Sequence, residues 1–285
     1  MKILQKEIQH FAEQLEVPPN TIDKDYVIGH FLNGLFEQQW AKEKILFKGG
    51  ACLKKCYFEN YRFSEDIDLT ISDKKFKLTK AGIVDVCNNI SAKTDILFNL
   101  ITFDEVFFKN HFVGWDIKIC FWGANHRRNE VPVFREHCHS FIESDARNHE
   151  VQLLASETRD IIHPYSDKQF ITSQATCYSI PEILSEKMRS LLQRNRGEAR
   201  DYYDLWYIKN NISDINWNIV KEVFLEKCNF KNISFKNPDD FFQEDRIMQA
   251  NNSWEHRLKH QLPKGMWIES NNSINELKRF FTELF

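Results

Sequence analysis

Apolar and polar positions follow two different periods along this chain. Residues 2–16 carry apolar side chains three or four positions apart, which predicts an amphipathic helix, and a second helix is expected from about residue 21 to residue 35. In the following hundred residues the apolar runs are short or alternate with polar residues, as is typical of strands. We expect strands at 45–47, 63–69, 96–98, 105–108 and 113–121, with a helix around 80–89.

Helical spacing dominates the rest of the chain, apart from an expected strand at 151–154. Helices are expected over 179–194, where Ser179 and Glu182 have the spacing of a capping box, and from 199 to 208. The fold class predicted is therefore α+β (α/β). We expect a domain over residues 1–172 with a mixed sheet flanked by helices, followed by a mainly helical domain over residues 173–285.

Composition narrows the class of protein. The 285 residues have a net charge of −3, which argues against a generally basic, nucleic-acid-coating protein but allows a local basic groove. Seven cysteines occur without C-x-x-C spacing and no signal peptide is recognisable, so a reduced, cytoplasmic protein is expected. No apolar run approaches the roughly 20 residues that a membrane-spanning helix needs.

The first candidate site is a pair of glycines. The apolar run 45–47 stops at Gly49 and Gly50, which predicts a buried strand that ends in a tight turn and leads into a helix. Unpaired backbone N–H groups at such a turn form an anion site. Lys54 could add a positive charge to a bound phosphate.

The second candidate site follows on the next strand. Side chains alternate along a strand, so Ser64, Asp66 and Asp68 share one face. Two carboxylates on one face repel each other unless a cation lies between them, and Mg²⁺ prefers carboxylates together with substrate phosphates. This pattern favours phosphoryl or nucleotidyl transfer. A solvated edge strand with a polar face is the alternative.

A third candidate region lies on the two later helices. Between Lys187 and Arg200 there are five cations against one acid, which could hold a triphosphate or an RNA backbone. Asp201 and Asp204 share a face of the following helix. The alternative is an exposed helix pair joined by salt bridges.

These segments together resemble the AbiEii-type nucleotidyltransferases, the toxin halves of bacterial toxin–antitoxin and abortive-infection systems within the polymerase-beta-like superfamily. The resemblance covers roughly residues 20 to 210. The segments that carry it are Lys48–Lys54 and Arg62–Leu69 for the first motif, Glu182 with Lys187 for the third, and Arg200-Asp201 with Asp204-Leu205 for the fourth.

The resemblance implies a nucleotidyltransferase fold whose helical domain completes the active cleft. It also implies transfer of a nucleoside monophosphate from an NTP to an acceptor, with RNA, at tRNA ends, as the expected acceptor and an antitoxin protein as a possible partner. The expected cofactor is Mg²⁺ or Mn²⁺. The implied roles are metal binding by Asp66, Asp68 and Asp116, catalysis by Asp66, Asp68, Lys187 and Asp201, and nucleotide binding by Gly49, Gly50, Lys54, Ser64 and Arg200.

Two positions depart from the family pattern. Ala51 stands where the family usually has Thr or Ser, so a hydroxyl contact to phosphate is missing. Asp116 is one candidate for a third carboxylate. If the strand is instead aligned with the family pattern apolar-Lys-apolar-acid, the position of the acid falls on Cys120, and two aspartates must then suffice. A nucleotidyltransferase acting on a protein or small molecule, and an inactive NTP-binding or interaction module, therefore remain open.

His137, Cys138 and His139 could also be interpreted as a zinc site. These residues are too close together for the usual zinc-ligand spacings, and no second pair is obvious. A His-rich loop or strand is the favoured interpretation.

Overall fold

Two compact units make up the computed structural model, which describes residues 4–127, 130–132, 134, 140–193 and 198–285. The first unit ends at residue 177, and the second unit runs from residue 178 to the end. The boundary expected from the sequence was after residue 172. The short segment 151–155 also belongs to the second unit. Residues 137–139, for which a zinc site was the less favoured interpretation, lie outside the described residues.

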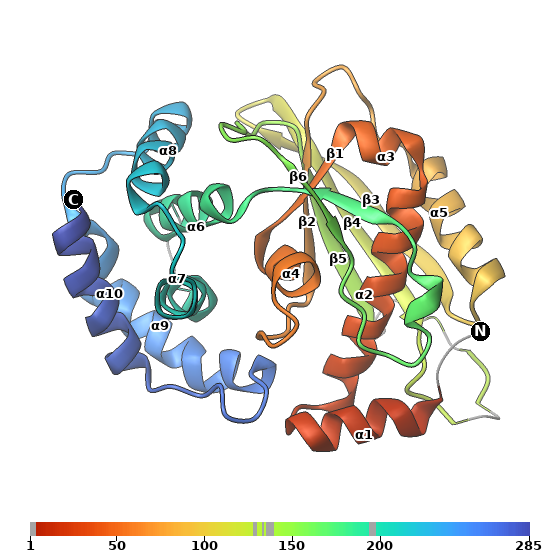
Figure 1. The fold of residues 1–285 in the computed structure, drawn as a ribbon. Coiled ribbons are helices and arrows are strands. Elements are labelled where there is room, and N and C mark those ends of the chain that lie inside the picture. Colours follow the sequence, from red (N-terminus) through yellow and green to blue (C-terminus); the bar gives the residue numbers. More distant parts are fainter. Residues whose placement is uncertain (1–3, 128–129, 133, 135–139, 194–197) are drawn as a thin grey trace. The chain divides into compact units, whose positions relative to one another are not determined.

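A seven-stranded mixed sheet forms the centre of the first unit (Figure 1). Its order is β3-β4-β5-β2-β1-β7-β6. Strand β1 pairs antiparallel with β2 and parallel with β7, while β2 pairs parallel with β5. The strands are β1 (Ile45–Lys48), β2 (Asp66–Ile71), β3 (Leu97–Phe108), β4 (His111–Trp122), β5 (Phe141–Arg147), β6 (Glu157–Asp160) and β7 (Gln174–Cys177).

Helices α2 and α5 pack against each other beside this sheet (Figure 1). Gly34 of α2 lets them approach closely, because a Cβ atom there would lie 2.4 Å from Cγ1 of Ile90. The helices of this unit are α1 (Gln5–Leu15), α2 (Pro19–Glu37), α3 (Gln39–Lys44), α4 (Gly49–Cys52), α5 (Lys80–Lys93), the π-helical η1 (Leu53–Tyr57) and the 3-10 turn η2 (Lys168–Phe170).

A buried polar network holds α2 to the segment before β7. Asp167 accepts hydrogen bonds from the Tyr26 hydroxyl at 2.9 Å and from Nε2 of His30 and His163, each at 3.0 Å. Burial lowers the pKa of His163 to about 4, so its imidazole is neutral at pH 7. This network explains the buried His30 as a structural residue.

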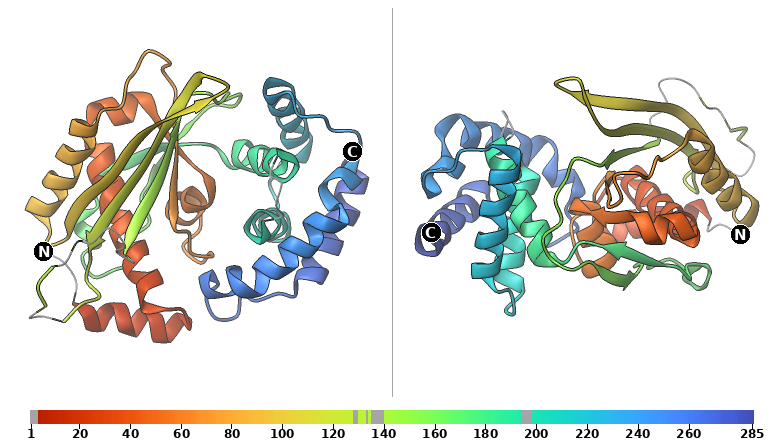
Figure 2. Two further views of the ribbon diagram at one scale, coloured as in Figure 1. Left: turned by 180° about the vertical axis from the view of Figure 1, so that it is seen from behind. Right: turned by 90° about the horizontal axis from the view of Figure 1, so that it is seen from above.

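The second unit is helical (Figure 2). Its core is rich in aromatic side chains. Phe241 contacts the rings of Phe224, Phe235, Phe281 and Phe285 with centroid distances of 5.1–6.0 Å. Its helices are α6 (Ile180–Gln193), α7 (Ala199–Asn211), α8 (Trp217–Lys231), α9 (Glu244–His256), α10 (Ser270–Leu284) and the 3-10 turns η3 (Pro238–Phe242) and η4 (Leu258–Gln261). No described helix has both the length and the apolarity needed to cross a bilayer.

The predictions for residues 151–154 and for the start of α6 were wrong for one shared reason. Residues 151–154 form no strand, and the backbone N–H groups of Leu153 and Leu154 donate to the Glu182 carboxylate instead. Glu182 is fully buried and also pairs with Lys227 at 2.6 Å. It is therefore unavailable for a capping box, and the Ser179 hydroxyl is buried without a hydrogen-bond partner among the described residues.

The Glu182–Lys227 pair should be essential for the stability of the second unit. Lys227→Met is expected to lower the free energy of unfolding by about 3–5 kcal/mol, because it leaves a carboxylate buried without its counter-charge. Urea unfolding measures this change. Lys259→Met is the matched control: its partner Glu255 is 3.4 Å away on the exposed surface, so the change should stay within about 0.5 kcal/mol. Equal losses in both variants would contradict the prediction.

Candidate active site

The glycine turn follows β1 and lies directly against β2, the strand that carries Asp66 and Asp68 (the D-x-D strand). Gly49 has φ +77°, which favours glycine, and a Cβ atom on it would lie 2.1 Å from Oδ2 of Asp68. A Cβ atom on Gly50 would lie 2.5 Å from Nη2 of Arg62 and 3.2 Å from Oγ of Ser64. The two glycines are therefore required by close approach, and the turn meets the residues predicted with it.

The glycine turn leads directly into a helical segment. Helix α4 begins at Gly49 and continues into η1, giving one helical segment over residues 49–57. The first N–H groups of a helix have no intrahelical acceptor and can bind an anion. Ala51 is buried and offers no hydroxyl, but the Ser64 hydroxyl lies beside Gly50.

Arg62 is a charged residue of this region to which the sequence analysis gave no role. Its side chain is 2% exposed, and its Nη1 donates to the carbonyl oxygen of Phe63 at 3.1 Å. The other terminal nitrogen faces Gly50. A buried guanidinium therefore places positive charge beside the predicted phosphate site.

Lys54, by contrast, has its ammonium group engaged within the fold. Nζ donates to the carbonyl oxygen of Glu59 at 2.6 Å and lies 4.6 Å from the centroid of the Phe63 ring. Burial lowers the pKa of Lys54 to about 8, against the opposing effect of Asp25. These contacts give Lys54 a structural role in holding the segment after η1.

Asp66 and Asp68 lie on one face of β2, as predicted from their spacing. Both are half-buried, whereas Ile67 and Leu69 between and after them are fully buried on the other face. In the parallel pairing with β5, Asp66 is opposite Glu143 and Asp68 is opposite Asp145. Acidic side chains from two neighbouring strands therefore share this face.

Asp145 is a second candidate site residue, after Arg62, that was not predicted from the sequence. It lies on the strand next to Asp68, whereas the predicted third carboxylate, Asp116, is opposite Asp145 on β4 and so lies one strand further away. The charged residues Glu143, Asp145 and Arg147 alternate with uncharged ones in the sequence, a pattern that is typical of a strand.

Arg147 compensates part of the negative charge. Its Nη2 lies 2.6 Å from Oδ1 of Asp116 and 3.4 Å from Oδ1 of Asp145. Partial burial and the nearby carboxylates of Asp116 and Asp66 raise the pKa of Asp145, and Arg147 opposes the rise. The face therefore retains an excess of negative charge next to Asp66.

The donor atoms on this face are of the type that a hard divalent cation prefers. Asp66, Asp68 and Asp145 bring carboxylate oxygens to one face of two adjacent strands, and Mg²⁺ and Mn²⁺ prefer oxygen ligands. A cation there would relieve the repulsion that raises the pKa of Asp145.

In the second unit, α6 and α7 bring three predicted residues together. Nζ of Lys187 lies 3.0 Å from Oδ1 of Asp201 and 2.6 Å from Oδ2 of Asp204. The Lys187 side chain is 9% exposed and that of Asp204 is fully buried. Two carboxylates thus fix the position of one lysine ammonium, and the ammonium stabilises both buried carboxylates.

Two cations of the predicted basic patch, Lys187 and Arg189, form ion pairs within the fold. Arg189 is buried and pairs with Glu186 at 3.6 Å. Arg194 and Arg196 fall outside the described residues. Arg200 is half-buried at the start of α7, one residue before Asp201.

The whole of this arrangement can be compared with known proteins. A family model described as "Nucleotidyl transferase AbiEii toxin, Type IV TA system" matches residues 30–267, which is most of the chain. The chain belongs to the AbiEii nucleotidyltransferase toxin family. It is thus a nucleotidyltransferase, and the match spans the glycine turn, the D-x-D strand and the Lys187 cluster.

A nucleotidyltransferase toxin of known structure shares the fold. MenT4, a nucleotidyltransferase toxin from Mycobacterium tuberculosis H37Rv, is 16% identical to the chain with a TM-score of 0.67. The similarity covers 99% of this chain and 89% of MenT4. A search of curated proteins found no match. The mixed sheet with a helical C-terminal region predicted from the sequence is therefore confirmed as a nucleotidyltransferase toxin fold.

Proposed function

We propose that this AbiEii-family protein transfers a nucleoside monophosphate from an NTP to an RNA acceptor, with tRNA ends as the substrate class, and releases pyrophosphate. One observation supports the proposal most strongly. Asp66 and Asp68 lie on one face of β2, and the turn at Gly49 lies directly against Asp68. Family membership supplies the reaction class, and this geometry supplies residues suited to it.

The residues of the first unit would bind and orient the nucleotide. The N–H groups at the Gly49–Gly50 turn and the guanidinium of Arg62 would bind the phosphates, with the Ser64 hydroxyl in place of the one that Ala51 lacks. Asp66, Asp68 and Asp145 would hold Mg²⁺ or Mn²⁺. When bound, this ion would neutralise phosphate charge and lower the pKa of the attacking hydroxyl.

Lys187 would supply a fixed positive charge to the same reaction. Negative charge moves onto the leaving pyrophosphate during transfer, and a preorganised ammonium stabilises it without reorganisation. Asp201 and Asp204 would act as positioning residues that hold the ammonium in place. Arg200 would add a second cation for the nucleotide.

The third carboxylate can be identified by comparing two isosteric changes. Asp145→Asn should raise the metal concentration needed for half-maximal transfer by about 10–100-fold, because it removes a carboxylate next to Asp68. Asp116→Asn should have little effect, since Arg147 binds that side chain one strand further away. Activity is measured in a titration with MgCl₂. A larger loss in Asp116→Asn would instead support Asp116 as the third carboxylate.

The acceptor class is tested by pyrophosphate release from each NTP with Mg²⁺. The proposal predicts release on addition of total tRNA and none with an RNA-free protein extract. Release with the protein extract or with small-molecule hydroxyl compounds alone would point to the other acceptors. NTP binding without any release would point to an inactive binding module.

A cytoplasmic protein restrained by an antitoxin is the cellular setting we propose. The family description names a type IV toxin–antitoxin system. Expression of the protein alone should slow bacterial growth, and the Asp66→Ala variant should not.

A further inference from the structure

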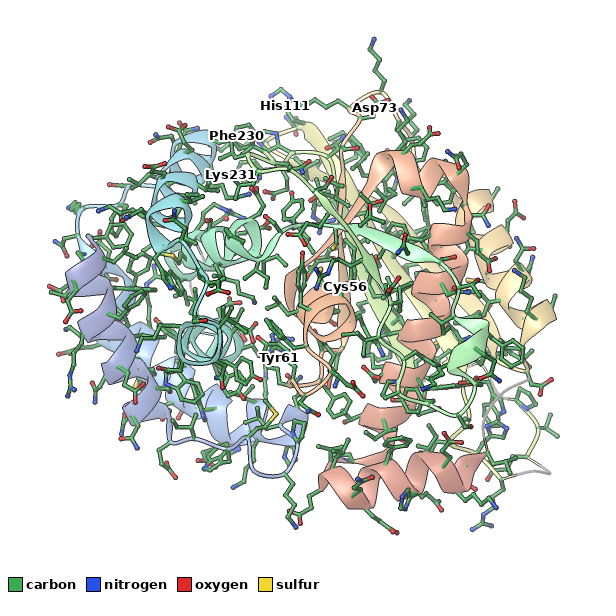
Figure 3. The ribbon with its side chains drawn as sticks, in the orientation of Figure 1. Cys56, Tyr61, Asp73, His111, Phe230 and Lys231 are labelled. Atoms are coloured by element: carbon green, nitrogen blue, oxygen red, sulfur yellow. The ribbon has the colours of Figure 1, made fainter. Side chains whose placement is uncertain are left out.

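Three cysteine side chains converge in the first unit at a place that the nucleotidyl transfer reaction does not use. Cys52, Cys56 and Cys177 are buried, and their sulfur atoms lie within 4.8 Å of one another. All three are free thiols. Cys56 is labelled in Figure 3 on the helical segment that follows the Gly49–Gly50 turn.

Strand pairing brings the third cysteine to the other two. Cys52 is the last residue of α4 and Cys56 lies four residues later in η1, so both project from one side of the same helical segment. Cys177 ends β7, where it pairs with Phe47 of β1 just before the turn. The cluster therefore joins α4 and η1, which follow the glycine turn, to the end of β7.

We propose that Cys52, Cys56 and Cys177 bind a thiophilic divalent metal ion, Zn²⁺, in a structural site separate from the carboxylate face. Thiolates are soft ligands that select Zn²⁺, whereas the carboxylates of β2 and β5 select hard ions such as Mg²⁺. The two kinds of metal would therefore sort between the two sites by ligand chemistry.

The sulfur spacing fits such an ion after a small contraction. With Zn–S bonds of about 2.3 Å in a tetrahedron, ligand sulfurs lie about 3.8 Å apart. The present separations of up to 4.8 Å need to shorten by about 1 Å at most, which small side-chain rotations can supply. The Tyr57 hydroxyl, 3.7 Å from Sγ of Cys177, offers an oxygen beside the fourth position.

Charge balance also favours a divalent ion. Three thiolates with Zn²⁺ carry a net charge of −1, and a buried charge of this kind requires a nearby partner. Arg159 is the nearby cation: its Nε donates to the carbonyl oxygen of Cys56 at 3.3 Å, and its guanidinium lies 4.6 Å from the centroid of the Tyr57 ring. Nη1 of Arg159 is also 3.6 Å from Oε2 of Glu157, so the guanidinium is shared between that carboxylate and the cluster. Metal binding would release the thiol protons to solvent.

The proposed ion would stabilise the glycine turn through the helical segment that follows it. It would link α4 and η1 to the end of β7, so that the helical segment beginning at Gly49 could not shift relative to β1. Removing the ion should lower the melting temperature of the protein, since a ligand that binds only the folded state stabilises it.

The test is metal analysis of reduced, zinc-loaded and desalted protein, with X-ray absorption at the zinc edge. One zinc ion per chain is expected, with a sulfur shell at about 2.3 Å fitted by three ligands. Substitution with Co²⁺ should give a thiolate-to-cobalt charge-transfer band. Because these measurements use the wild-type chain, they decide the proposal even if a cysteine variant fails to fold.

Variants then assign the ligands. Cys177→Ser should lose the zinc and the cobalt band, while Cys87→Ser, another buried thiol of the same unit on α5, should keep both. Asp68→Asn should also keep the zinc, which separates this site from the carboxylate face. Failure of the wild type to retain zinc, a shell of oxygen and nitrogen only, or full zinc content in folded Cys177→Ser would overturn the proposal.

Discussion

Asp68→Asn is expected to lower the rate of nucleotidyl transfer by about a thousandfold, because a metal ion at this carboxylate supplies several kcal/mol of charge stabilisation. Asparagine keeps the size of the side chain, so the close approach of Gly49 to Asp68 is preserved. The loss should therefore appear in kcat, with an unchanged circular dichroism spectrum. Single-turnover transfer with labelled NTP measures it.

Glu65→Gln provides the matched control for Asp68→Asn. Glu65 is exposed and lies just before β2, and the substitution removes the same charge from the same segment. Its activity should stay close to that of the wild type. Similar losses in the two variants would mean that the overall charge of the segment matters and that Asp68 has no specific role.

Lys187→Met should have the second-largest effect, and it should act on both stability and rate. The substitution leaves the buried carboxylates of Asp201 and Asp204 without the ammonium that pairs with them, which should lower the free energy of unfolding by about 3–5 kcal/mol. The proposed loss of charge stabilisation should lower kcat by about 100–1,000-fold. Urea unfolding and single-turnover kinetics measure the two effects separately.

A double substitution separates the structural role of Lys187 from its catalytic role. Asp204 is the fully buried member of the cluster, so Asp204→Asn in the Lys187→Met background removes the more deeply buried of the two stranded charges. Lys187→Met/Asp204→Asn should thus regain stability while remaining inactive. Recovery of both stability and activity would show that Lys187 only maintains the fold.

The first unit shows what a sequence pattern can and cannot predict. The glycine pair after an apolar run and the alternation of Asp66 and Asp68 with buried neighbours are local signals, and β1, the turn and β2 form as expected. Strand β5 was missed because its inward-facing residues are Ile142, Ser144 and Ala146, which give only a weak apolar alternation. Asp145 was missed with it.

Contacts between distant segments were the second limit. The capping box predicted for Glu182 does not form, because Lys227 on another helix forms an ion pair with that carboxylate. The spacing of Asp201 and Asp204 placed both on one face of α7, but spacing alone does not identify Lys187 on α6 as their partner. Likewise, no sequence spacing relates Cys177 to Cys52 and Cys56, since strand pairing brings them together.

The central claim is that the carboxylates of β2 carry out nucleotidyl transfer. The most direct test incubates wild-type protein and Asp66→Ala, side by side, with Mg²⁺, total tRNA and each α-radiolabelled NTP in turn. Label on RNA from the wild type with at least one NTP, and none from folded Asp66→Ala, is the predicted result. Equal labelling by folded Asp66→Ala would contradict the claim, as would the absence of label on any acceptor when the wild type binds NTP.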